Sequence, residues 1–192
     1  MPAPDSIITL DDAKLHLRIS DDVTDHDQIL QQLIDGASQA IASYCGRLFM
    51  ITTETAKKLD GDGTDTLLLK YPVQSISSLS NDGTAVVVTT NYELYETIGR
   101  VVLTDGTVWV NGRKTVTITY TYGYSIDDIP RDVVSACLYL VASKFQAFQQ
   151  DRIGVTSKTF GDQSISYERG IPKEVRELLI PWQIVNDDRW AY

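Results

Sequence analysis

The sequence has little positive charge and no cluster of it. Lys and Arg number 17 against 26 Asp and Glu, which gives the 192-residue chain a formal net charge of −9. Proteins that wrap nucleic acid tightly use clustered Lys and Arg to displace phosphate counterions. The composition therefore excludes tight wrapping of DNA or RNA, and an acidic surface would instead repel a nucleic acid that passes near it.

Cysteine and histidine are also scarce. Cys45 and Cys137 lie in apolar helical patterns without a CxxC pair or a His cluster, so neither a zinc site nor a disulfide framework is predicted. His16 and His26 have no partner in a motif that places a nucleophile, and the chain lacks GxxxxGK[ST], GxGxxG after a strand, GxSxG and HExxH. We expect no catalytic activity, no cofactor and no metal site, and we interpret the cysteines as buried free thiols.

Long apolar runs are absent as well. None approaches the ~20 residues of a membrane-spanning helix, and the N-terminus has no basic region followed by an apolar one. With 43% hydrophobic residues, the chain can nevertheless bury a sizeable core. We expect a soluble globular protein that is made and used in a cytosolic setting.

Helical periodicity is present near both ends of the chain. Thr9, with Asp12 three residues later, predicts a capping box for a first short helix, and a long second helix is expected from Asp27 to a stop at Gly46. Farther along, Pro130 suits the first turn of a third helix. That helix is apolar on most of its circumference and is expected to be the central core helix.

A fourth short helix is predicted to begin near Pro172 and to stop at Pro181. Before it, residues 155–160 and 164–167 flank Gly161-Asp162 and predict a β-hairpin arm. Trp182, Trp190 and Tyr192 gather at the end of the chain, where large aromatic residues suit a docking segment. For Trp182 a second interpretation stays open, namely that it packs the fourth helix against the core.

The middle of the chain has the character of a β subdomain, with Thr, Val, Tyr and Ile runs separated by DG and NG dipeptides that favour tight hairpins. The last run, TVTITYTY, alternates Val, Ile and Tyr with Thr, as a strand with one buried face does. The expected strands span 67–70, 75–79, 86–89, 92–95, 101–103, 108–110 and 115–122.

Two features of this middle region suggest binding sites. The motif DGDGTD at 60–65 gathers three carboxylates, but Asp65 and Tyr71 stand where an EF-hand loop needs Gly and Glu, so we favour a solvated turn. A set of tyrosines could form a glycan-binding face, although tyrosines are equally normal as cross-strand partners. They are Tyr71, Tyr92, Tyr95, Tyr120, Tyr122 and Tyr124.

These patterns together predict an α+β fold, with a mainly helical core of about four helices, an inserted antiparallel β subdomain and a hairpin arm. The expected parts are N-terminal helices at 1–48 and the β subdomain at 49–126. The core helix, arm and last helix follow at 127–182, and the tail at 183–192.

The order of several segments resembles the head-tail connector (adaptor, head-completion) family of long-tailed bacteriophages. The segments are LDDAKLHLRI, DHDQILQQLIDGASQAIASYCGR, DGDGTDTLLLKYPVQSISSL, TYTYGY, DIPRDVVSACLYLVASKF, FGDQSISY and IPKEVRELLIPW. They cover nearly the whole chain. The β insertion is larger than the minimal helical core of that family requires.

The resemblance implies a structural virion protein of the neck, synthesised in the bacterial cytoplasm. It implies a ring, usually of twelve subunits, that contacts the portal and the next neck, stopper or tail-terminator protein, with a channel for DNA. On this basis we expect portal docking through Trp182, Trp190 and Tyr192. The candidate residues for contacts between subunits lie in the arm and are Val155, Phe160, Ile165 and Tyr167. The alternative function is a β-rich glycan-binding or adhesion module.

Overall fold

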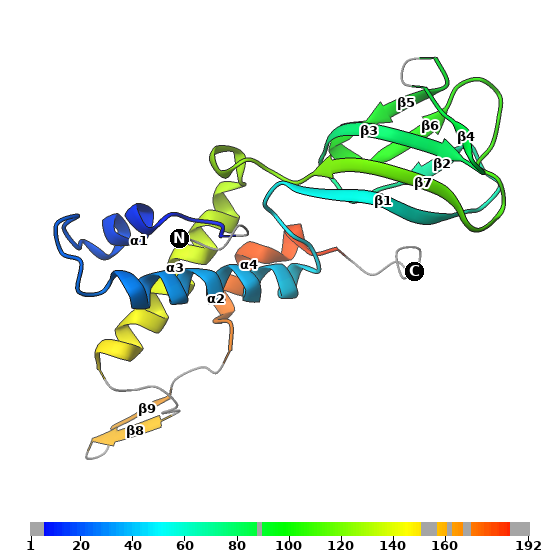
Figure 1. The fold of residues 1–192 in the computed structure, drawn as a ribbon. Coiled ribbons are helices and arrows are strands. Elements are labelled where there is room, and N and C mark those ends of the chain that lie inside the picture. Colours follow the sequence, from blue (N-terminus) through cyan, green and yellow to red (C-terminus); the bar gives the residue numbers. More distant parts are fainter. Residues whose placement is uncertain (1–5, 88–89, 151–156, 161–162, 167–169, 185–192) are drawn as a thin grey trace. The chain divides into compact units, whose positions relative to one another are not determined.

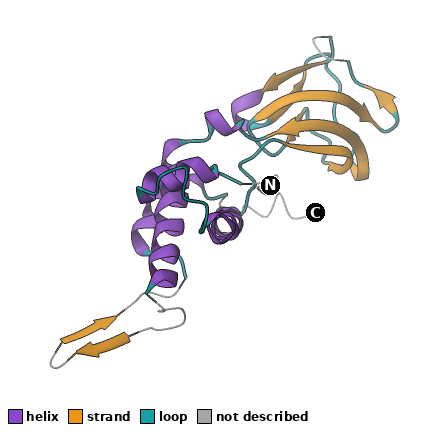
Figure 2. Cartoon of the chain, turned by 60° about the vertical axis from the view of Figure 1, so that its left-hand side comes forward, coloured by secondary structure: helices purple, strands orange, loops and turns teal. Residues whose placement is uncertain are grey.

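The computed structural model describes residues 6–87, 90–150, 157–160, 163–166 and 170–184. The chain divides into two compact units, each described by itself below. Unit 1 comprises Met1–Phe49 and Ile126–Val185, and unit 2 includes Met50–Ser125. The described helices α1 to α4 belong to unit 1, and the two larger sheets belong to unit 2 (Figure 2). The predicted α+β class is confirmed.

Unit 1 contains the four predicted helices (Figure 1). Thr9 caps the first through the expected reciprocal pair, in which Asp12 N donates to Thr9 Oγ1 at 3.1 Å and Thr9 N donates to Asp12 Oδ2 at 2.9 Å. Gly46 ends the second in the left-handed conformation, at φ +68°. The fourth continues as a 3-10 turn, Ile180–Trp182, so Pro181 lies inside that turn. The bounds are α1 Leu10–Leu17, α2 Asp27–Cys45, α3 Arg131–Gln149 and α4 Lys173–Leu179.

The third helix, α3, is the centre of unit 1, as its apolar circumference predicted. It packs against α1, α2 and α4 (Figure 1). The helix α2, which packs against it, buries Leu30, Ile34 and Ile41 among others. The buried residues of α3 are Val133, Ala136, Cys137, Leu140, Val141 and Phe145.

The predicted arm is a hairpin of two short antiparallel strands, β8 (Ser157–Phe160) and β9 (Gln163–Ser166). They form a separate two-stranded sheet. In its register Phe160 pairs with Gln163 and Lys158 pairs with Ile165. Val155 and Tyr167 lie outside the described residues.

Unit 2 is built from two antiparallel sheets. One has the order β1-β7-β3-β4 and the other the order β2-β6-β5. The strands are β1 Thr52–Gly61, β2 Thr66–Leu68, β3 Val73–Asn81, β4 Thr84–Ala85, β5 Tyr92–Tyr95, β6 Arg100–Leu103 and β7 Gly112–Tyr122.

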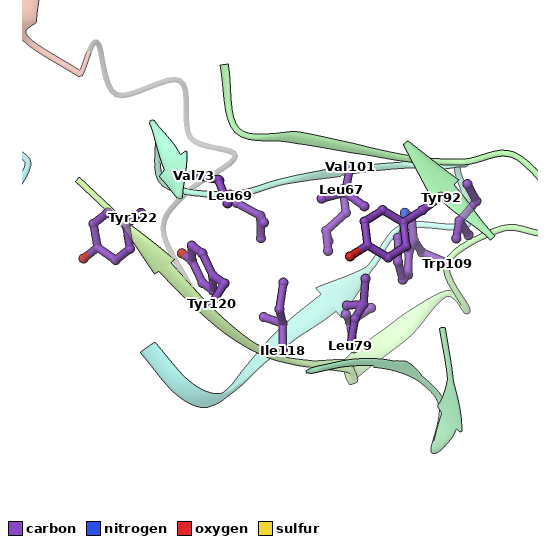
Figure 3. Close-up of a cluster of buried hydrophobic side chains, with 12 residues drawn as sticks. Leu67, Leu69, Val73, Leu79, Tyr92, Val101, Trp109, Ile118, Tyr120 and Tyr122 are labelled. Carbon is purple, nitrogen blue, oxygen red and sulfur yellow. The ribbon is translucent and has the colours of Figure 1, made fainter. Parts of the chain in front are cut away.

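The core of unit 2 lies between these sheets. Figure 3 shows Ile118 and Tyr120 of β7 pointing toward Leu67 and Leu69 on the opposite side. Trp109 is fully buried, and its Nε1 donates to the Asp65 carbonyl at 3.1 Å. Along β7, alternate residues from Val116 to Tyr122 are buried, which confirms the predicted one-sided strand.

Two strand predictions in unit 2 were wrong, and one strand was missed. Residues 108–110 form no strand, because the Asn81 side chain accepts from Val110 N at 2.9 Å and donates to Val108 O at 2.8 Å in place of a ladder. The strand expected at 86–89 is instead β4, just before it, and residues 88 and 89 lie outside the described part. The prediction missed β1, a polar strand with a register shift at Ala56, where φ is +48°.

Among the described residues, no helix has the length and apolar character to cross a membrane.

Candidate interaction surfaces

The two histidines lie against aromatic rings. His16 is exposed on α1, and its ring meets Tyr139 of α3 edge-on at 6.0 Å between centroids. His26, half-buried before α2, meets Phe145 in the same way at 5.4 Å. Within the described part of the chain, no group of three His, Cys, Asp or Glu residues could hold a metal ion. Each histidine thus makes an edge-on contact with an aromatic ring of α3.

The two thiols are buried, as expected. Burial raises the pKa of Cys45 to about 11 and that of Cys137 to about 12. Such thiols stay protonated at neutral pH, and a protonated thiol is a poor nucleophile and metal ligand.

The carboxylates of the DGDGTD motif face different partners. Asp62 accepts from Thr64 N at 2.9 Å and from Thr64 Oγ1 at 2.7 Å, and these bonds lower the pKa of Asp62. Asp60 accepts from Lys114 N of β7 at 2.6 Å. Asp60 and Gly61 end β1, and residues 62–65 form an exposed, hydrogen-bonded turn, in agreement with the interpretation favoured from the sequence.

The tyrosines of unit 2 do not form a common exposed face. Tyr92, Tyr120 and Tyr122 are buried in the core, where the rings of Tyr120 and Tyr122 stack at 5.5 Å (Figure 3). Burial raises the pKa of Tyr120 to about 12. Of the six, Tyr95 is exposed, and the Arg100 guanidinium lies 4.5 Å from its ring centroid. This arrangement weakens the glycan-binding alternative.

The last described residues are fixed to the end of α2. Ile184 N donates to Cys45 O at 2.9 Å, and the Gln183 side chain donates to Tyr44 O at 3.4 Å. Trp182 is half-buried, and its indole Nε1 is shielded from solvent without a hydrogen-bond partner among the described residues. Trp182 is therefore partly a packing residue. The other two docking candidates, Trp190 and Tyr192, lie outside the described residues.

A groove between α1 and α3 was not anticipated from the sequence. It has a volume of about 460 Å³ and is lined by Ile7, Ile8, Thr9, Asp12, Leu15, His16, Ile126, Asp127, Val134 and Leu138. Leu15, on its α1 wall, is 79% exposed, the most exposed large apolar side chain among the described residues. Helical periodicity places Leu15 on the polar side of α1. An apolar residue on that side was the sequence signal that could have indicated the groove.

Comparison with known protein families and structures gives one family and one fold. A family model described as "Head completion protein" matches residues 6–185. No curated protein matches the chain.

Solved structures with this fold come from particles of a gene transfer agent (GTA). A chain from the neck of the empty GTA particle, computed with C6 symmetry, has 18% identity and a TM-score of 0.58. A chain from the neck of the native particle, computed with C12 symmetry, has 17% identity and a TM-score of 0.58. One from the virion of the native particle has 19% identity and a TM-score of 0.55. Each match covers 96% of this chain and 93% of the other.

Proposed function

Because the chain belongs to the head completion protein family, we propose that it is a structural subunit of a phage-like virion neck, where it connects the head to the tail. The observation that carries this proposal is the extent of the family match, residues 6–185, which spans both units. The fold likeness to a neck chain extends over 96% of this chain. The β subdomain is therefore part of the common architecture and needs no separate function such as glycan binding.

The proposed assembly is a ring of twelve copies. In a cyclic ring each copy contacts its two neighbours through two different surfaces. The two surfaces must be complementary, because the same head-to-tail contact repeats by rotation around the ring. The related neck structures were computed with C6 and C12 symmetry, and a twelve-fold ring satisfies both. Unit 1 offers two such surfaces in the hairpin and the α1–α3 groove.

A channel for the genome fits the charge of the chain. The excess of 26 acidic over 17 basic residues makes a poor DNA-binding surface. Duplex DNA could pass such a wall without adhering, since like charges repel across a hydrated gap. The proposed role of the protein toward DNA is thus passive, without sequence-specific contacts.

The proposed partners are the portal on one side and a stopper or tail-terminator protein on the other. We assign portal docking to the end of the chain, Trp182 with Trp190 and Tyr192. Trp182 is half-buried, so part of its side chain stays open to a partner. Trp and Tyr are enriched among the residues that dominate binding energy at interfaces. No catalytic step is proposed.

Electron microscopy of the purified chain, with and without its portal, tests the function. Rings of twelve copies, alone or on the portal, are the expected result. A chain that stays monomeric with the portal present, at concentrations where portal rings are intact, contradicts the connector role. A glycan array run in parallel should show no binding.

A further inference from the structure

The α1–α3 groove has the character of a protein-binding surface. Its floor is apolar, formed by Ile7, Ile8, Val134 and Leu138. Leu15 and Ile126 of the lining are 79% and 41% exposed, and Tyr139, whose ring meets that of the lining residue His16, is 54% exposed. Several exposed large apolar side chains in one place usually mark an interaction site.

The groove is also held in a fixed shape. Ile7 N donates to the buried Ser38 Oγ at 3.0 Å, and Ser6 Oγ donates to Asp35 Oδ1 at 2.9 Å, so α2 anchors the segment that forms one wall. The Thr9 capping box fixes the start of α1. A pre-formed site binds with a smaller loss of conformational entropy than one that must be ordered on binding.

We propose that this groove receives the β8–β9 hairpin of a neighbouring copy, an inference that rests on the proposed ring. The hairpin needs such a surface, because its strands of four residues each pair in a sheet of two. A two-stranded hairpin by itself is at best marginally stable in water, and packing against another element stabilises it. Burying its unpaired edges would also protect them from aggregation.

The two surfaces have complementary chemistry. The strands SKTF and QSIS contain Phe160 and Ile165, one cation in Lys158 and no acid. The groove offers an apolar floor with Asp12 and Asp127 at its margin. The segment between the strands adds Asp162, so the hairpin has no net charge. In a chain with a net charge of −9, an uncharged segment is repelled less by an acidic rim than an acidic segment would be.

The path of the chain along α3 is compatible with a contact between copies. Val134 and Leu138, which line the groove, lie in the first half of α3, whereas the hairpin follows the end of α3 at Gln149. The helical rise places Leu138 about 16 Å along the axis from that end. The chain therefore leaves α3 toward the hairpin at the helix end far from the groove residues. A head-to-tail contact joins two such different surfaces of neighbouring copies.

Site-specific disulfide cross-linking tests the contact. One full-length chain carries Leu15→Cys and a second carries Phe160→Cys, and the two are mixed, oxidised and separated on a non-reducing gel while micrographs record rings. Leu15 is mostly exposed, whereas Cys45 and Cys137 are buried. A disulfide-linked dimer therefore reports on the added thiols and not on the native ones. A covalent dimer that forms only in the mixture is the expected result. The matched control replaces Leu15→Cys by Ile98→Cys, which is 52% exposed on unit 2, and should give no dimer.

The other outcomes are separable. Rings without the Leu15–Phe160 dimer overturn the inference and leave the connector role intact. A cross-linked monomer in the double variant, with no dimer in the mixture, overturns it by placing the hairpin on its own groove. Absence of rings contradicts the proposed ring and the inference with it.

A second variant, Leu15→Lys, should lower the ring-forming affinity about tenfold, as expected for one apolar contact. Unchanged ring formation in that variant would count against the groove.

Discussion

Lys14 Nζ lies 2.6 Å from Asp27 Oδ1, and this ion pair joins α1 to the first turn of α2. The Lys14 side chain is only 4% exposed, whereas that of Asp27 is 31% exposed. Lys14 Nζ also donates to the Asp21 carbonyl at 3.3 Å, which ties the intervening acidic loop to α1. A single buried cation therefore organises the helix pair that carries the groove wall.

Removing either partner of this pair should destabilise unit 1, with an asymmetry set by burial. Asp27→Asn leaves a buried ammonium without its counter-charge and should cost about 3–5 kcal/mol. Lys14→Met leaves a carboxylate that is partly exposed, although its Oδ1 is buried, so we expect a smaller loss, about 1–3 kcal/mol. Urea unfolding of the full chain measures both values. Lys173→Ala is the control, since its pair with Glu177 spans 3.7 Å between side chains that are 74% and 61% exposed. It should change stability by less than about 0.5 kcal/mol, and equal losses in all three variants would contradict the role of Lys14.

Trp109 should dominate the stability of unit 2. Trp109→Ala removes the largest fully buried side chain of the described residues and should cost about 3–5 kcal/mol. Trp109→Phe keeps most of the volume but loses the bond to the Asp65 carbonyl, for about 1–2 kcal/mol. Chemical denaturation followed by circular dichroism gives the comparison. Val108→Ala, at a side chain that is 49% exposed, should stay within about 0.5 kcal/mol of the parent.

Residues 50–125, produced alone, should fold. The unit has its own core of twelve buried residues between two sheets, and 76 residues is within the size at which single domains fold independently. Dispersed amide resonances and a cooperative thermal transition are the expected observations. A fragment without either would mean that unit 2 depends on unit 1, against the prediction that 49–126 is an inserted subdomain.

The buried thiols should make the protein sensitive to alkali. The folded-state pKa values, about 11 for Cys45 and about 12 for Cys137, lie above the ordinary value of 9.0. Unfolding then favours loss of a proton, so the stabilisation is complete below pH 9.0 and is lost as pH rises toward 11 and 12.

At pH 8 both thiols should react with iodoacetamide far more slowly than in the unfolded chain, because the thiolate fraction falls about tenfold per unit of pKa. Mass spectrometry with and without urea measures this protection. In the Cys45→Ala/Cys137→Ala variant, stability should fall less steeply between pH 9 and 11. The part due to Tyr120, whose pKa is also raised, to about 12, should remain. Rapid labelling of both thiols in the native protein would contradict their burial.

Truncation after Ile184 should separate docking from folding. Deleting residues 185–192 keeps the bonds from Ile184 and Gln183 to α2, so the melting temperature should not change while attachment to the portal weakens. Deleting residues 183–192 also removes those two bonds and should cost a further ~1–2 kcal/mol. Co-sedimentation with portal rings and thermal melting measure the two effects. A 185–192 deletion that binds the portal as well as the full chain would show that the aromatic tail has no docking role.

The helices of unit 1 were predictable from the sequence because their signals are local. Thr9 and Asp12 satisfy each other within one turn, and Gly46 ends α2 through its own backbone freedom. The apolar circumference of α3 likewise indicates its central position without knowledge of its neighbours. The order of these segments also sufficed to indicate the family to which the chain belongs.

Strand boundaries in unit 2 were less predictable because strands depend on distant partners. The Asn81 side chain binds Val108 O and Val110 N, and Trp109 pairs through its backbone with Gly63 and Thr64. No local pattern indicates these pairings, because the partners lie 27 or more residues away in the chain. The β1 strand is polar and interrupted at Ala56, and pairing with β7 makes it a strand. The alternation along β7 indicated a buried face that includes Tyr120 and Tyr122, but the residues that pack against that face became known only once both sheets were in place.

The sequence by itself thus determined the α+β class, the helices, the hairpin, the absence of the usual catalytic motifs and the family resemblance, all of which depend on local chemistry or on the order of segments. Tertiary structure alone decided the burial of Lys14 beside Asp27 and the groove beside Leu15. Both arise where residues distant in the chain meet. The physical reason is that burial and cavities belong to the packing of several elements, and no single element encodes them.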